Sequence, residues 1–186
     1  LVHAFQYLRG LEFVDPKRVG MGGFCVGASM ATVAAEDARI RSDVVFINFF
    51  GGYYDANDLL KAIASRTRFY GGSQRPWQPG ELTEEVFTSE LIEGLDLPSD
   101  RELLTRIFLQ GQAASGPEMA TLSPQGQVVH RLLNGVSLEE AERLVQQLPA
   151  RTQQMLDAVS PKYHIGNLRA RMLIMHDAND SLVPSD

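Results

Sequence analysis

The residues with the clearest capacity for chemistry form the pentad Gly-Phe-Cys-Val-Gly at positions 23–27. A short apolar run (19–21) precedes the pentad and a small-residue, helix-prone run (28–35) follows it, which predicts a strand, a tight turn and a helix. Glycines two residues before and after Cys25 give the strand and the helix room to approach closely. At a helix N-terminus, free N–H groups and the positive dipole end favour a thiolate. Cys25 is therefore a candidate nucleophile.

This pentad resembles the nucleophile elbow of the α/β-hydrolase superfamily, G-x-S-x-G, with Cys in place of Ser. Within that superfamily, the dienelactone hydrolase group carries a Cys elbow that this pentad resembles. The match extends upstream, where a helical pattern over 1–11 and a D-x-x-[RK]-[VI] turn at 15–19 precede the elbow strand.

A second stretch, 176–184, follows a predicted strand and is similar to the H-G-x-x-D-x-x-V-P segment of many α/β-hydrolases. His176 matches the His, Asp177 replaces the Gly and Asp180 matches the acid of the catalytic triad. The chain order of nucleophile and then acid agrees with the family. The alternative for Asp180 is a turn residue, because Asn-Asp-Ser is typical of turns, but the chain order favours the triad acid.

The resemblance implies acyl transfer on a carboxylic ester, lactone or thioester. Cys25 would attack the carbonyl carbon and form an acyl-enzyme, and the N–H of Val26 would supply half of an oxyanion hole. Phe24, Tyr53 and Tyr54 are expected to shape the substrate pocket. No cofactor is expected, and no metal site either, because the histidines and the single cysteine are dispersed.

This interpretation leaves the catalytic base unassigned. In the family the histidine lies beyond the acid, so we expect no true base among these 186 residues. His176 is the best substitute, although a structural hydrogen bond is the favoured role for it. Asp180 would orient the imidazole.

Three alternatives stay open. Cys25 is a buried and inert core residue in the first, since free cysteine is often buried. In the second, the chain is a non-catalytic binding domain of the same fold. In the third, Cys25 is a redox-sensitive thiol in an apolar cleft.

The sequence predicts an α/β fold, with a partial parallel sheet of the α/β-hydrolase type and a helical cap inserted into it. Continuous apolar runs at 44–50 and 171–176 predict buried strands. The expected parts are a core portion (1–55), a helical cap (56–160) and a second core portion with the acid loop (161–186).

Within the expected cap, almost all patterns are helical. Two S-x-x-E capping boxes, at 99–102 and 137–140, predict helix starts, and a helix is expected over 82–95. The stretch 70–80 is rich in glycine and proline and is predicted as a loop.

Composition limits the classes of function. The chain carries 17 basic and 23 acidic residues, a net charge of −6, and no basic stripe, so nucleic acid is an unexpected partner. No apolar run reaches the length of a membrane span. A single cysteine fits a reducing compartment, so we expect a cytoplasmic protein with a small-molecule acyl substrate. A homo-oligomer stays open.

The two ends of the sequence add one expectation. The chain begins without Met in a helical pattern and stops just after the acid motif. We expect a fragment that lacks N- and C-terminal parts of the core and that is inactive as a hydrolase by itself.

Overall fold

The computed structural model describes residues 1–70 and 72–185. Gly71, within the predicted loop 70–80, and Asp186, at the end of the predicted part 161–186, lie outside the described residues. The fold is mixed α/β, and the described chain divides into two compact units, residues 1–56 with 157–185 and residues 57–156. Each unit has its own core.

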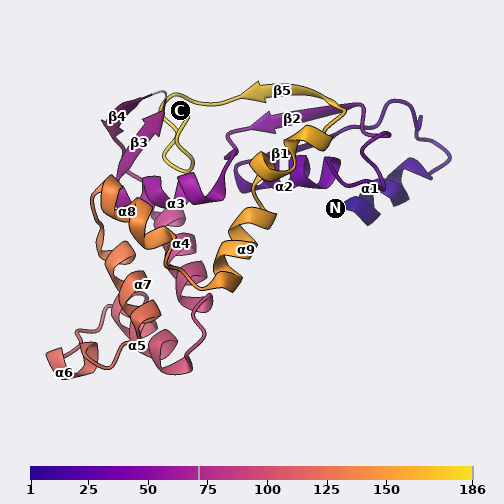
Figure 1. Ribbon diagram of the computed structural model, residues 1–186. Helices are drawn as coiled ribbons and strands as arrows, with labels where there is room; N and C mark the ends of the chain where they lie inside the picture. Colours follow the sequence, from indigo (N-terminus) through magenta and orange to yellow (C-terminus); the bar gives the residue numbers. More distant parts are fainter. Residues whose placement is uncertain (71, 186) are drawn as a thin grey trace. The chain divides into compact units, whose positions relative to one another are not determined.

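The first unit is built on a parallel sheet of β1 (Met21–Phe24), β2 (Phe46–Phe50) and β5 (Arg171–Met175), in the order β1-β2-β5. These strands lie side by side in Figure 1, with α2 (Val26–Ala35) along one face. The register pairs Phe24 with Phe50 and Phe50 with Met175. All three strands therefore end level, and the residues that follow them emerge at one edge of the sheet.

The core of this unit lies on one face of the sheet, where α1 (Val2–Arg9) and α2 supply apolar side chains. Ile47 and Phe49 of β2 point into this core because alternate residues of a strand share a face. The buried members are Phe5, Ala28, Ala35, Ile40, Val44, Ile47 and Phe49.

The prediction that the strands at 44–50 and 171–176 are fully buried is wrong, because the face of the sheet opposite the core is exposed. On this face, Phe46, Leu173 and Met175 are exposed by 41%, 54% and 40%. On the core face, Ile174 of β5, which pairs with Phe49, is exposed by 62%. The reason is that the helices of this unit pack on one face, while β5 lies at the end of the strand order. Apolar runs predict that a strand forms, but they do not show how many of its faces are covered.

A clamp joins the end of the first segment of this unit to the start of its second segment. The Ala56 N–H donates to Ser160 Oγ (2.8 Å), and the Lys162 N–H donates to the Tyr54 carbonyl (3.1 Å). Lys162 Nζ also binds the buried carboxylate of Asp55 at 2.7 Å. Two short 3₁₀ helices, η1 (Pro161–Tyr163) and η2 (Ile165–Asn167), lead from the clamp to β5.

The second unit is mainly helical. Its helices bury one apolar cluster that includes Leu91, Leu104, Val129 and Leu144. They are α3 (Ala56–Ser65), α4 (Glu81–Glu93), α5 (Pro98–Phe108), α6 (Gly116–Met119), α7 (Pro124–Asn134), α8 (Leu138–Val145) and α9 (Ala150–Ala158). The first residue of α3 and the end of α9 belong to the first unit.

Two predictions for this unit are wrong. Part of the predicted loop 70–80 forms a hairpin instead, in which β3 (Thr67–Tyr70) pairs antiparallel with β4 (Ser73–Pro76). The predicted capping box at 99–102 is absent among the described residues, because α5 starts earlier, with Pro98 in its first turn and Leu97 as N-cap. Proline is favoured there since its missing N–H costs nothing. The predicted helix start at Ser137 is confirmed, because its hydroxyl accepts the Glu140 N–H.

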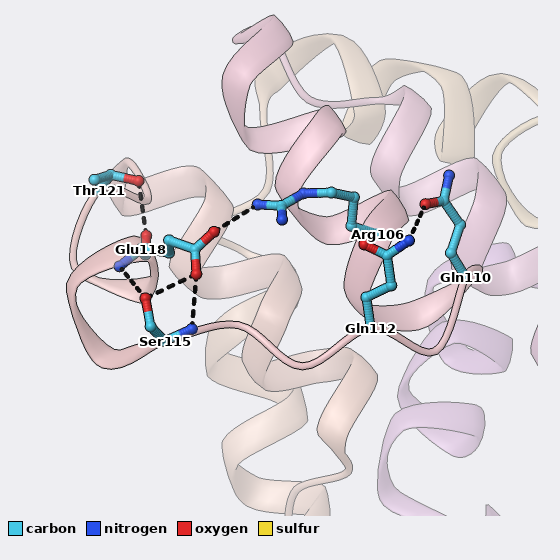
Figure 2. Close-up of polar contacts among 6 residues, drawn as sticks. All are labelled: Arg106, Gln110, Gln112, Ser115, Glu118 and Thr121. Carbon is cyan, nitrogen blue, oxygen red and sulfur yellow. Dashed lines mark hydrogen bonds and ion pairs between the residues drawn. The ribbon is translucent and has the colours of Figure 1, made fainter.

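Figure 2 shows a capping box that the sequence analysis missed, at the start of α6. Ser115 Oγ accepts the Glu118 N–H (3.4 Å), and Glu118 Oε2 accepts the Ser115 N–H (2.8 Å). Arg106 of α5 donates to the other carboxylate oxygen at 2.9 Å. These contacts, first those from Ser115 and then that from Arg106, lower the pKa of Glu118 to about 2. Glu118 thus joins the short helix to α5.

Glu36, the C-cap residue of α2, is an anomaly in the first unit. It is only 5% exposed, and neither oxygen of its carboxylate has a hydrogen-bond partner among the described residues. Burial raises the pKa of Glu36 from 4.5 to about 7, since the charged form is poorly solvated.

We expect Glu36→Gln to stabilise the protein above about pH 8 by roughly 2 kcal/mol, a value discounted for partial screening by solvent. The folded chain holds this proton to a higher pH than the unfolded chain, so wild-type stability falls as the pH rises from 4.5 to about 7. Below this window the two proteins should differ little. Urea unfolding across the pH range tests this, with exposed Glu12→Gln as control. An equal pH slope in both variants would contradict it.

Candidate active site

Cys25 occupies a strained position between β1 and α2. It is the N-cap of α2 and has φ 53° and ψ −135°, a backbone conformation that L-residues rarely adopt. Its N–H donates to the Phe50 carbonyl (2.8 Å), and its carbonyl accepts the Ala28 N–H (2.9 Å). The sheet and the helix together hold the turn. Such strain clusters at functional sites.

The first glycine of the pentad makes this turn possible. A Cβ on Gly23 would lie 2.3 Å from the carbonyl carbon and oxygen of Gly27 and 2.6 Å from the Ala28 nitrogen. A Cβ on Gly27 would meet nothing within 4 Å. The expectation that both glycines provide room is therefore wrong for Gly27, since the close approach falls on the strand side of the turn.

A cavity of about 360 Å³ opens where the three strands end. Its apolar walls include Phe24 and Phe50, whose rings stack with centroids 4.9 Å apart. The lining residues are Phe24, Cys25, Phe50, Gly51, Met175, His176, Asp177, Asp180 and Leu182. Four residues that the sequence analysis selected, Phe24, Cys25, His176 and Asp180, thus meet in one cavity, while Tyr53 and Tyr54 are outside this lining set.

The carboxylate of Asp180 is held by its own loop. Its Oδ1 accepts the N–H groups of Leu182 (2.7 Å) and Val183 (3.2 Å). Its Oδ2 faces Gly51, where a Cβ would lie 3.0 Å away and where φ is 59°. Glycine at position 51 thus lets the chain after β2 pass close to the carboxylate.

The ring of His176 is oriented by the same loop. Its Nε2 lies 3.0 Å from the Val183 carbonyl and 3.5 Å from Asp180 Oδ2. Because a carbonyl can only accept, we assign the proton of the neutral ring to Nε2, which leaves Nδ1 with a lone pair. The contact with the Val183 carbonyl is a structural hydrogen bond of the kind that the sequence analysis favoured for His176.

The remaining predicted residues lie around the same turn. Val26 is the first residue of α2, so its N–H has no partner within the helix. Tyr53 is buried, and Tyr54 is half exposed. Sequence reasoning missed Phe50, Gly51, Met175 and Leu182 as cavity residues. The sequence signal that could have identified them is their position at or after the end of a predicted strand, because residues at the carboxyl ends of parallel strands share one edge of the sheet.

The other three histidines are not among the lining residues of this cavity: His3 is on α1, His164 follows η1, and His130 is on α7 of the second unit. Within 1–70 and 72–185, no group of three or more His, Cys, Asp or Glu side chains is arranged to hold a metal ion. Among these residues, no helix has both the length and the apolar character needed to span a bilayer. Comparisons with protein-family models, curated proteins and solved structures found no match.

Proposed function

We propose that this chain carries the nucleophile and the acid of a hydrolase of the α/β-hydrolase type that uses cysteine as its nucleophile. The substrate class is a carboxylic ester, lactone or thioester. The observation that carries the proposal is the strained strand–turn–helix at Cys25, which shares a cavity with His176 and Asp180. The strand order β1-β2-β5, with an inserted helical unit before β5 and an acid after it, supports the same assignment. Residues 57–156 correspond to a cap in this proposal.

The chemistry follows from the positions of the atoms. Ionised Cys25 attacks the carbonyl carbon, and the electron pair of the C=O π bond moves to the oxygen, next to the N–H of Val26. When the carbonyl re-forms, the bond to the leaving group breaks and a thioester remains on Cys25. Water then hydrolyses the thioester. Phe24, Phe50 and Met175 favour an apolar acyl group.

Asp180 and His176 supply the proton chemistry in this proposal. His176 is the imidazole that the cavity offers, and its Nδ1 is the atom that can take the Cys25 proton. Asp180 and the Val183 carbonyl hold the other nitrogen and so orient the ring.

The test is to trap the acyl-enzyme. The chain has a single cysteine, so a thioester formed from p-nitrophenyl acetate can lie only on Cys25. We expect a nitrophenolate burst equal to the protein concentration and an acetylated peptide containing Cys25, both absent after alkylation with iodoacetamide. Acetylation confined to lysines would contradict the proposal. Rapid oxidation of Cys25 by peroxide without acylation would favour the redox thiol, and neither reaction would favour the binding domain.

A further inference from the structure

The cavity at Cys25 is lined by two carboxylates, and none of the described residues in its lining is a lysine or an arginine. Asp177 and Asp180 follow β5 on one turn, in which the Asp180 N–H donates to the Asp177 carbonyl at 3.1 Å. Exposed carboxylates are ionised at neutral pH, and a charged His176 would offset only one of the two. The lining therefore attracts cations and repels anions.

The two carboxylates differ in how far their own loop already engages them. Asp180 accepts two backbone N–H groups and lies 3.5 Å from His176 Nε2. Asp177 is exposed, and its Oδ1 accepts the Asn179 N–H at 2.9 Å. Its Oδ2 has no partner among the residues that the structure describes. Asp177 is thus the carboxylate whose charge can act on a bound molecule.

Aromatic rings in the same lining also suit a cation. Phe24 and Phe50 stack with their ring centroids 4.9 Å apart, and Phe24 is 75% exposed. The face of an aromatic ring attracts a cation, and proteins recognise quaternary ammonium groups in this way. Because such rings accept neutral apolar groups too, the carboxylate of Asp177 is what favours a cation over a neutral group of the same shape.

We propose that Asp177 selects an ester or thioester whose apolar acyl chain carries an alkylammonium group over neutral and anionic analogues. This inference rests on the proposed function and names the substrate class of the same site. Asp177 makes and breaks no bond, so the loss of its charge should change the choice between substrates. The segment of many α/β-hydrolases that 176–184 resembles has glycine at this position, so the carboxylate is a feature of this chain.

The experiment compares two esters of the same shape. The p-nitrophenyl esters of 4-(trimethylammonio)butyrate and 5,5-dimethylhexanoate differ only in a charged nitrogen in place of a carbon. The nitrophenolate burst rate of each ester is divided by its spontaneous hydrolysis rate. We expect wild type to prefer the cationic ester and Asp177→Asn to lower this preference about tenfold. The wild-type preference should also shrink in about 1 M salt, because salt screens exposed charges.

Asp15→Asn is the matched control. Asp15 is exposed, its Oδ1 accepts the Lys17 N–H at 3.0 Å, and its carbonyl accepts the Arg18 N–H at 3.0 Å. These contacts repeat those of Asp177 in its own turn, but Asp15 is not in the cavity lining. Asparagine keeps an oxygen that can accept the N–H, so both turns should survive. The control should therefore show the wild-type preference.

A second readout needs no carbonyl group. The Cys25 thiolate attacks the sulfenyl sulfur of a methanethiosulfonate, a disulfide forms and methanesulfinate leaves. We expect the 2-(trimethylammonio)ethyl reagent to react faster than the 2-sulfonatoethyl reagent. The ratio of the two rates should fall at least about tenfold in Asp177→Asn, since one reagent is attracted and the other repelled.

The possible results separate the two proposals. Acylation with the same preference in wild type and Asp177→Asn would reject the role of Asp177 and leave the hydrolase proposal standing. An equal loss of preference in Asp15→Asn would also reject it, since that indicates an effect of net charge alone. Wild-type protein that neither ester acylates would reject both proposals.

Discussion

Replacing Cys25 by alanine is expected to abolish the acyl adduct and to lower the rate of ester acylation at least about a thousandfold. The sulfur is the only atom of the site that can form a thioester, and the chain has no second cysteine to replace it. Alanine accepts the backbone of position 25 no less well than cysteine, because both carry one Cβ at the same φ of 53°. The fold should therefore survive, and the loss should be one of chemistry.

The measurement is the nitrophenolate burst with p-nitrophenyl acetate together with thermal unfolding of the same samples. Cys25→Ser is the informative companion, since it keeps a nucleophile but a weaker one at neutral pH. We expect its burst rate to fall between those of wild type and Cys25→Ala. Equal bursts in all three proteins, with unchanged unfolding temperatures, would remove Cys25 from the mechanism and leave the binding-domain interpretation.

Gly23→Ala is expected to destabilise the protein by at least about 3 kcal/mol or to prevent folding. The new methyl group would stand 2.3 Å from the backbone of Gly27, which belongs to a helix and cannot turn away like a side chain. Relief requires that β1 and α2 separate, and that movement would also displace the Cys25 turn between them.

Gly27→Ala is the matched control, because it adds the same methyl group to the same turn where nothing lies within 4 Å. Position 27 is inside α2, so alanine should be neutral or stabilise the helix by up to about 1 kcal/mol. Urea unfolding of both variants gives the comparison. Similar stabilities for the two would show that strand and helix are further apart than this geometry requires.

Much of the first unit could be predicted from sequence. Strands of a parallel sheet do form within the runs at 44–50 and 171–176 and in the elbow segment. Short continuous apolar runs bounded by turn residues are typical of such strands. The apolar runs could not show how much of each strand is covered by other elements of the fold. Ile174 is as apolar as Ile47, yet one is exposed and the other fully buried. Both side chains are on the core face by register, so the difference comes from their place in the strand order: β2 is the central strand and β5 is an end strand.

The second unit shows the limits of local signals. Ser99 and Glu102 have capping-box spacing, but Pro98 starts the helix earlier, while the box at Ser115 and Glu118 went unnoticed beside its glycine and proline. The β3–β4 hairpin was hidden in the same way, since Gly and Pro mark both loops and tight turns.

The candidate site divides along similar lines. Cys25, His176 and Asp180 could be selected because each belongs to a short motif that follows a strand. The hydrogen bonds between Ser29 Oγ and the Tyr53 backbone could not be predicted, since the two residues are 24 positions apart and nothing local pairs them. Only folding of α2 against the end of β2 brings them together. Contacts of this kind leave little trace in the sequence.

The clamp at Ala56, Ser160 and Lys162 has a consequence for how this chain can evolve. It fixes, within the first unit, the two points between which residues 57–156 depart and return. Once the two ends of an inserted segment are fixed, doubling the length of that segment costs only about 0.6 kcal/mol of loop-closure entropy. Insertions and deletions within residues 57–156 should therefore have little effect on the register in which β2 pairs with β5. The helical unit can thus change in length without shifting the sheet or its cysteine turn.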